Sequence, residues 1–287
     1  LSGGFGAVTL GRNTSPYDDV SADHAMMEQS IFDPSNTNNG NPASTAASLN
    51  TPSSAASFLN RNSSWIGYNT RFNNSIRYDS PVFAGVSGAV LYAFGEDKKA
   101  ATGTAQSVSA SNSFSASLKY VNGPLLVSGG YQSEGIARTA ALKPRLENML
   151  VNAMYDFGVA RVGVGFNRAK YNDVAAPAVV GLAAPGAASF DAQKEWSLSV
   201  AVPVGAATFS AGYAQSKGDT LGKSSGVGVQ ATYALSKRTT VYLGAQSTKA
   251  YDTLVSQITS GALAGYTANA SDIGRVRYVG TGIRHTF

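Results

Sequence analysis

Residues 226–235 read Gly-Val-Gly-Val-Gln-Ala-Thr-Tyr-Ala-Leu, and along this stretch apolar residues alternate with small or polar ones. Successive side chains of a β-strand point to opposite faces. A period of two therefore predicts a strand with one apolar face and one polar face. The same alternation occurs over residues 113–120 and 160–166. The chain is thus predicted to be built from amphipathic strands.

Alternating segments recur along the whole sequence and predict about twelve strands. They lie near residues 5–12, 72–79, 86–95, 113–121, 125–133, 147–156, 159–170, 193–202, 206–216, 225–234, 239–248 and 276–287. Short turns, such as Asn122-Gly123, alternate with long connections rich in Gly, Ala, Ser, Asn and Pro. Because Asn-Gly is a strong hairpin signal, consecutive strands are expected to be antiparallel neighbours. A short helix is expected within the longest connection, over residues 22–31.

The composition narrows the class of protein. Charged residues make up 14% of the chain, whereas a typical soluble domain has about 25%. Cys is absent, which excludes disulfides and thiolate metal sites. The formal net charge is +5, but the basic residues are dispersed rather than clustered, which argues against a nucleic-acid partner. No cofactor motif is present.

The pattern predicts an all-β fold, a transmembrane antiparallel up-and-down β-barrel. Alternating strands of about ten residues, with short turns on one rim and long loops on the other, are typical of such barrels. Lipid would cover the apolar face and water the polar face. A soluble sandwich, which buries its apolar faces in an inner core, is the alternative.

Several segments, in order along the whole chain, resemble the Gram-negative general porins of the β-proteobacterial type. They are GFGAVTLGR (4–12), RFNNSIRYDSPVFAGVSG (71–88), YAFGE (92–96), YDFGVA (155–160), ALSKRTTVYLG (234–244) and GIRHTF (282–287). The resemblance implies a homotrimeric outer-membrane barrel of sixteen strands. With about twelve strands recognised by pattern, it also implies that the leader and the N-terminal strands are lacking here.

The resemblance further implies one porin domain over residues 1–287. The connection from about 13 to 70 would be the third long loop, which in this family folds into the lumen and narrows it. The expected function is passive diffusion of small hydrophilic solutes and ions, with a preference for anions. The expected partners are outer-membrane lipid, two further copies of the chain, the barrel-assembly machinery, and small anions and hydrophilic solutes.

Selectivity in a pore depends on its diameter and on the charge of its wall. Alternation over 72–79 places Phe72, Ile76 and Tyr78 toward lipid and Ser75 and Asp79 toward the lumen. The basic residues that the same logic turns inward are Arg71, Arg77, Lys119, Arg161 and Arg284. The acidic residues that the loop would place opposite them are Asp18, Asp19, Asp23, Glu28 and Asp33. We expect a field across the constriction, with Arg71 and Arg77 foremost. The alternative is that these residues only solvate the lumen and anchor the loop through ion pairs.

Two other functions are alternatives for an outer-membrane barrel of this kind. A barrel hydrolase needs a nucleophile and a base, yet the chain has two histidines, His24 and His285, and neither lies in a catalytic motif. An adhesin would act through its long loops, which lack a cluster of aromatic anchors. At the C-terminus, Phe287 and Ile283 resemble the signal that the assembly machinery reads, with Phe287 expected at the membrane interface.

Overall fold

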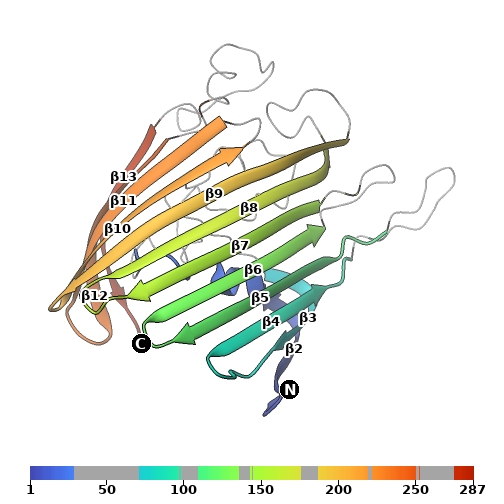
Figure 1. Cartoon of the computed structure of the whole chain (residues 1–287), viewed down its shortest axis with the longest axis horizontal. Coiled ribbons are helices and arrows are strands. Elements are labelled where there is room, and N and C mark those ends of the chain that lie inside the picture. Colours follow the sequence, from blue (N-terminus) through green and yellow to red (C-terminus); the bar gives the residue numbers. More distant parts are fainter. Residues whose placement is uncertain are drawn as a thin grey trace.

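The computed structural model describes residues 1–28, 71–96, 98, 109–135, 143, 145–175, 187–218, 222–249, 252 and 275–287. The described residues form one 13-stranded antiparallel sheet, in which each strand is hydrogen-bonded to the strands that precede and follow it in the sequence (Figure 1). The strands are β1 Ser2–Gly3, β2 Gly6–Thr14, β3 Arg71–Asp79, β4 Val86–Ala93, β5 Ser113–Asn122, β6 Leu125–Gly135, β7 Arg145–Asp156, β8 Arg161–Ala175, β9 Ala187–Val204, β10 Ala207–Gly218, β11 Gly222–Ala234, β12 Thr239–Lys249 and β13 Arg275–His285. All twelve predicted strands are confirmed, and β1 is an addition of two residues.

The sheet has two faces of opposite character. The helix α1, Pro16–Ser21, and residues 22–28 lie against one face, which we call the inner face (Figure 1). Buried polar side chains such as Ser115, Gln132 and Asn148 line it. The opposite or outer face exposes large apolar side chains, including Leu118 and Met149, each 60% exposed. A chain that exposes its apolar residues and buries its polar ones is arranged for lipid outside and water inside.

The two edge strands of the described sheet are the first and the last strand in the sequence. The strand order places β1 at one edge and β13 at the other. Closure of the sheet into a barrel stays a prediction. No helix among the described residues is long and apolar enough to span a membrane.

The helix begins earlier than predicted. Residues 22–28 are not helical, so the predicted helix over 22–31 is wrong there, and residues 29–31 lie outside the described chain. Ser15 caps α1 instead, because its Oγ accepts the Asp18 N–H at 3.1 Å. Pro16 follows at the first helical position, where a missing N–H is tolerated. This Ser-Pro pair was the sequence signal for the true start.

A bulge between β2 and β3 inverts the predicted alternation. The register shifts between Gly11 and Asn13, and Asn74 has a φ of 48°, a left-handed conformation that Asn tolerates. An extra residue on one strand moves every side chain beyond it to the other face. Phe72 therefore packs inside with Leu91 and Ala93, contrary to its predicted lipid-facing position.

The same bulge corrects the prediction for Arg71. Phe72 is buried on the inner face, so its neighbour Arg71 belongs to the opposite face, and Arg71 is exposed. Arg71 and Arg77 consequently do not share a face. Ser75 and Arg77, which lie on the near side of the bulge, keep their predicted inward positions.

The C-terminal strand ends slightly short of the chain end. β13 ends at His285, and Phe287 is fully exposed beyond it. The Phe287 ring contacts the His285 ring edge to face, with centroids 5.0 Å apart. Ile283, at 64% exposure, faces outward as predicted.

Candidate functional site

Residues 14–28, which we call the inner segment, cross the inner face of the sheet. Tyr17 is the first fixed point, because its backbone N–H donates to Ser115 Oγ of β5 at 3.0 Å. Its hydroxyl reaches three strands further, to Asn167 Oδ1 of β8 at 2.8 Å. The Tyr17 side chain is wholly buried. The inner segment is thus packed against the wall of the sheet at its start.

Further along, backbone groups of the inner segment bond polar side chains of the wall. Asn152 Nδ2 of β7 donates to the Val20 carbonyl at 2.5 Å. Ser199 of β9 donates through its hydroxyl to the His24 carbonyl at 2.6 Å and accepts the Met26 N–H at 3.1 Å. Buried backbone groups of irregular chain need such partners, which explains why the inner face carries so many Ser, Asn and Gln side chains.

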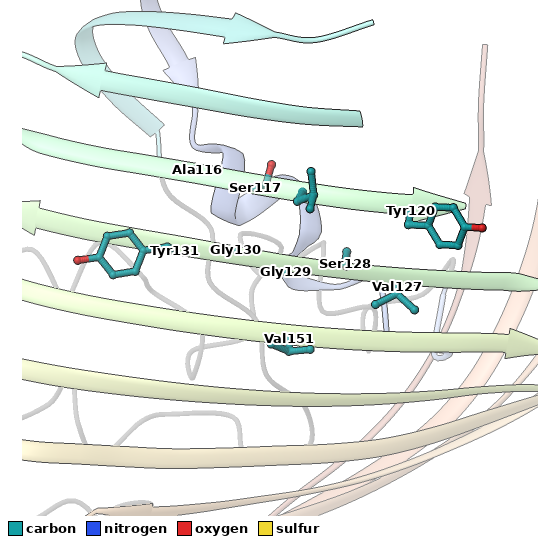
Figure 2. A pocket seen from close by; sticks show the side chains of 10 residues that line it. Ala116, Ser117, Tyr120, Val127, Ser128, Gly129, Gly130, Tyr131 and Val151 are labelled. Atoms are coloured by element: carbon teal, nitrogen blue, oxygen red, sulfur yellow. The ribbon is translucent and has the colours of Figure 1, made fainter. Parts of the chain in front are cut away.

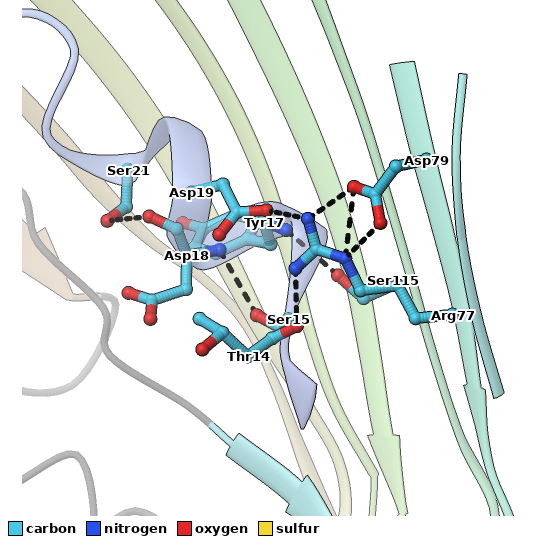
Figure 3. A network of polar contacts seen from close by, with 9 residues as sticks. All are labelled: Thr14, Ser15, Tyr17, Asp18, Asp19, Ser21, Arg77, Asp79 and Ser115. Atoms are coloured by element: carbon cyan, nitrogen blue, oxygen red, sulfur yellow. Dashed lines mark hydrogen bonds and ion pairs between the residues drawn. The ribbon is translucent and has the colours of Figure 1, made fainter. Parts of the chain in front are cut away.

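Arg77 forms hydrogen bonds and ion pairs with several groups at once. Its Nε donates to both carboxylate oxygens of Asp79, and its Nη1 donates to the Thr14 carbonyl at 2.8 Å. Its Nη2 forms ion pairs with Asp19 of α1 and with Asp79. Figure 3 shows the guanidinium held between the two carboxylates, above the entry to the helix. The Arg77 side chain is only 15% exposed, so its charge is used to hold the inner segment.

The electrostatic environment of Asp19 reflects this position. Burial raises the pKa of Asp19, while the hydrogen bond and the charge of Arg77 act in the opposite direction. Because Asp79 also lies beside Arg77, two carboxylates share one guanidinium. Arg77 therefore carries no surplus positive charge toward the lumen.

Two more ion pairs join the wall to the inner segment. Lys119 Nζ of β5 lies 2.8 Å from Asp23 Oδ1. Both terminal nitrogens of Arg161, at the start of β8, lie 3.4 Å from the carboxylate oxygens of Glu28. Together with Arg77–Asp19, these pairs match three predicted basic residues with three predicted acidic ones. The ion-pair alternative describes these contacts better than charges that face each other across open water.

Glycines in the wall strands allow the inner segment to lie close to the wall. A Cβ added to Gly163 would lie 2.0 Å from the His24 carbonyl oxygen, and one added to Gly165 would lie 2.8 Å from the His24 ring. A Cβ at Gly130 would lie 3.1 Å from the side chains of Tyr17 and Val20. Contacts below 3.0 Å do not occur in real proteins, so positions 163 and 165 must lack a side chain for this docking. The alternation over residues 160–166 places both glycines on the polar face but gives no sign of this contact.

His24 is a buried neutral residue rather than a catalytic base. It is 0% exposed, and among the described residues neither ring nitrogen has a hydrogen-bond partner. Burial lowers the pKa of His24 to about 4. Without a bonded nucleophile or carboxylate, the imidazole is not part of a triad.

The remaining predicted residues lie at different places in the structure. Arg284 of β13 is exposed on the inner-face side, opposite Thr240 of β12. Asp18 lies in the first turn of α1, and its carbonyl accepts the Ser21 hydroxyl at 2.9 Å. Asp33 lies outside the described residues. Arg71 is separated from the cluster by the bulge.

A groove opens on the outer face and belongs to the lipid side. It has a volume of about 500 Å³, and Tyr120, Val127, Tyr131 and Val151 are among the residues that line it (Figure 2). Its lining residues come from β5, β6 and β7, and the large apolar ones occupy outward-facing positions. The groove carries no titratable cluster and is not part of the lumen site.

Comparisons with known proteins agree with this architecture. A family model described as Gram-negative porin matches residues 1–253. No curated protein matches the chain in a sequence search. The chain is similar to the solved anion-selective porin from Comamonas acidovorans, with 25% identity and a TM-score of 0.66, over 100% of this chain and 76% of that one.

Two further solved structures show the same fold at lower identity. Outer-membrane expressed OmpT of Vibrio cholerae is 16% identical, with a TM-score of 0.56, over 98% of this chain and 77% of that one. Salmonella typhi OmpF, solved in complex with daunomycin, is 14% identical, with a TM-score of 0.55, over 98% of this chain and 75% of that one. The chain therefore belongs to the Gram-negative porin family, whose members are non-enzymatic passive diffusion channels of the outer membrane.

Proposed function

We propose that the inner segment sets the cross-section of a water-filled channel through which small hydrophilic solutes and ions diffuse. One observation carries the proposal: three ion pairs, Arg77–Asp19, Lys119–Asp23 and Arg161–Glu28, tie this segment to the inner face of β3, β5 and β8. Irregular backbone is tolerated at membrane depth when it lines water or is buried in protein. A segment held in this way narrows the lumen permanently.

The channel is further proposed to prefer anions. The exposure of the three ion pairs does not by itself favour either sign. The Lys119 side chain is 30% exposed and its partner Asp23 13%, so the cation is the more accessible member of that pair. In the pairs Arg77–Asp19 and Arg161–Glu28 the carboxylate is the more exposed member, at 36% against 15% and 44% against 32%. Arg284 adds an exposed cation on the inner-face side of β13. Accessible positive charge on a pore wall lowers the barrier for anions. The similarity to a porin described as anion-selective supports the same preference.

Planar-bilayer recording of the purified protein tests both parts. Stepwise, ohmic conductance is expected in symmetric salt. In a salt gradient, the reversal potential is expected to have the sign that a greater permeability to anions than to cations produces. Complete absence of conductance would exclude the channel, whereas conductance with a cation-side reversal potential would exclude only the anion preference.

We also propose that the chain assembles as a homotrimer. The similar OmpT of Vibrio cholerae has been described in a trimer form, and it shares the fold at 15% identity with a TM-score of 0.53. Unheated protein is expected to sediment in detergent with three times the protein mass of the chain. A single protein mass at all concentrations would refute trimer formation.

A further inference from the structure

Four basic residues form a continuous row across β8, β9, β10 and β11. The basic row consists of Arg168, Lys194, Lys217 and Lys223. In the strand register Arg168 lies opposite Lys194, Lys194 opposite Lys217, and Lys217 opposite Lys223. Directly opposite residues have Cα atoms about 4.5–5.5 Å apart. Like charges at this spacing destabilise a sheet unless a counter-charge is supplied.

The basic row lies on the outer face. Lys194 precedes Glu195, which is buried on the inner face, so the Lys194 side chain points outward. Lys217 shares its alternation with Tyr213, an exposed outer-face residue. All four residues of the row are exposed. The charge therefore lies on the side that faces lipid rather than the lumen.

A band of aromatic residues indicates how deep in the membrane the basic row lies. Trp196 lies two residues from Lys194 on the same face, and its ring contacts that of Tyr213 with centroids 5.3 Å apart. Phe166 lies opposite Trp196 in the register and two residues from Arg168. Aromatic girdles mark the membrane–water interfaces of barrels. The basic row, one step beyond this band toward the strand ends, is at the level of the lipid headgroups.

The row belongs to the rim that carries the long connections. β8 and β9 are joined there by residues 176–186, and β12 and β13 by residues 250–274. In outer-membrane barrels the longer connections face the outside of the cell. At the same rim Lys249 lies opposite Arg275 in the register, which extends the positive charge to β12 and β13. Among the described side chains, Lys194 and Lys217 form no ion pair, whereas the backbone N–H of Lys223 donates to Asp252 Oδ1 at 2.7 Å.

We propose that the basic row is a binding site for the phosphate groups of an anionic lipid in the outer leaflet. A headgroup with two phosphates supplies the counter-charge that Lys194 and Lys217 lack, and long lysine stems reach headgroup oxygens from the aromatic level. This site is independent of the channel, because it lies on the opposite face of the sheet.

The test measures binding of a bisphosphorylated glycolipid to full-length protein in zwitterionic detergent, through tryptophan fluorescence and the lipid that co-purifies. Lys194→Gln with Lys217→Gln is expected to weaken binding about tenfold or more. The matched control, Lys237→Gln with Arg238→Gln, removes two positive charges at the opposite rim and is expected to bind like the wild type. Bilayer conductance of all three proteins is expected to agree, which keeps this test separate from the channel test.

The remaining arms distinguish a lipid from other sources of phosphate. The same glycolipid without its phosphates is expected to lose binding, and inorganic phosphate alone at millimolar concentration is expected not to bind. Equal binding of the Lys194/Lys217 variant and the wild type would overturn the proposal. So would equal binding of the dephosphorylated lipid, and inorganic phosphate bound as tightly as the lipid would show a free-phosphate site instead.

Discussion

At the scale of single residues, the charges of the lumen act in pairs. Arg77 contacts Asp19, Asp79 and the Thr14 carbonyl, and is therefore an anchor for the inner segment as well as a charge on the wall. Hydrogen bonds to charged groups contribute about 1.5–3 kcal/mol each, more than neutral ones. Removing the guanidinium thus affects both the position of the segment and the sign of the local field.

Replacing Arg77 with Ala should have two measurable effects. Asp19 and Asp79 would lose their shared cation, so the reversal potential in a salt gradient is expected to move toward cations. The freed segment should raise the single-channel conductance and its variance. Arg71→Ala is the matched control, since Arg71 lies beyond the bulge on the other face. Equal shifts from the two variants would contradict the assigned faces.

His24 predicts a pH dependence of the docked segment. The folded pKa of His24 is about 4, below its ordinary value of 6.5, so the undocked state binds the proton more tightly. The docked state should be fully stable above pH 6.5 and lose stability as the pH falls from 6.5 to 4. At 1.36 kcal/mol per pKa unit, the loss is about 3 kcal/mol.

Limited proteolysis of the inner segment as a function of pH measures this loss. His24→Asn should remove the part of the pH dependence due to the imidazole. The exposed His285, replaced by Gln, is the natural control and should leave the profile unchanged. The interpretation fails if His24→Asn has the same pH profile as the wild type.

At the scale of elements, β8 is a docking surface as much as a strand. Its inward positions Gly163 and Gly165 leave the space that His24 fills, while the outward Val164 and Phe166 remain apolar and exposed. A strand usually loses stability through glycine, because nothing packs on that position. Here the inner segment supplies the missing contact.

Gly163→Ala should displace the inner segment without unfolding the sheet. The added Cβ would lie 2.0 Å from the His24 carbonyl, a distance that only movement of the backbone relieves. Faster proteolysis of residues 14–28 and higher conductance are expected, with the β-sheet circular dichroism unchanged. Gly4→Ala, whose Cβ meets nothing within 4 Å, is the control. Unchanged proteolysis of the Gly163 variant would show that the segment is not held at β8.

The last strand gives a prediction about assembly. We expect Phe287, fully exposed beyond β13, and Ile283, on the outer face, to be read by the assembly machinery. Phe287→Ala should reduce the amount of protein inserted into the outer membrane several-fold while purified protein still refolds in detergent. Thr286→Ala is the adjacent control. Normal insertion of the Phe287 variant would contradict a role for Phe287 in assembly.

The strands could be predicted from sequence because water on one face and lipid on the other impose a period of two. The inward position of Phe72 could not be predicted in this way. A single bulge at Asn74 reverses the alternation, and the pattern of apolar residues around it does not reveal the bulge. The ion pairs could not be predicted either. Lys119 and Asp23 are 96 residues apart, and only the path of the inner segment brings them together. Strand alternation and the family resemblance predict opposed charges, and the structure brings three such pairs into contact.

At the scale of the whole molecule, we propose a separate function for each of the two faces of one sheet. The inner face holds the segment that we propose narrows the channel, and the outer face carries the aromatic band and the basic row that we propose contact lipid. The two faces are coupled only through the alternation of the strands. Substitutions on one face should therefore leave the function of the other intact.

The most direct test of the account is the single-channel conductance of a variant that carries Asp19→Asn, Asp23→Asn and Glu28→Gln together. These changes remove all three ion pairs between wall and inner segment with little change in side-chain volume. A conductance above that of the wild type is expected, with a reversal potential shifted toward anions, because Lys119 and Arg161 lose their partners and Arg77 keeps only Asp79. A variant with the conductance and reversal potential of the wild type would contradict it.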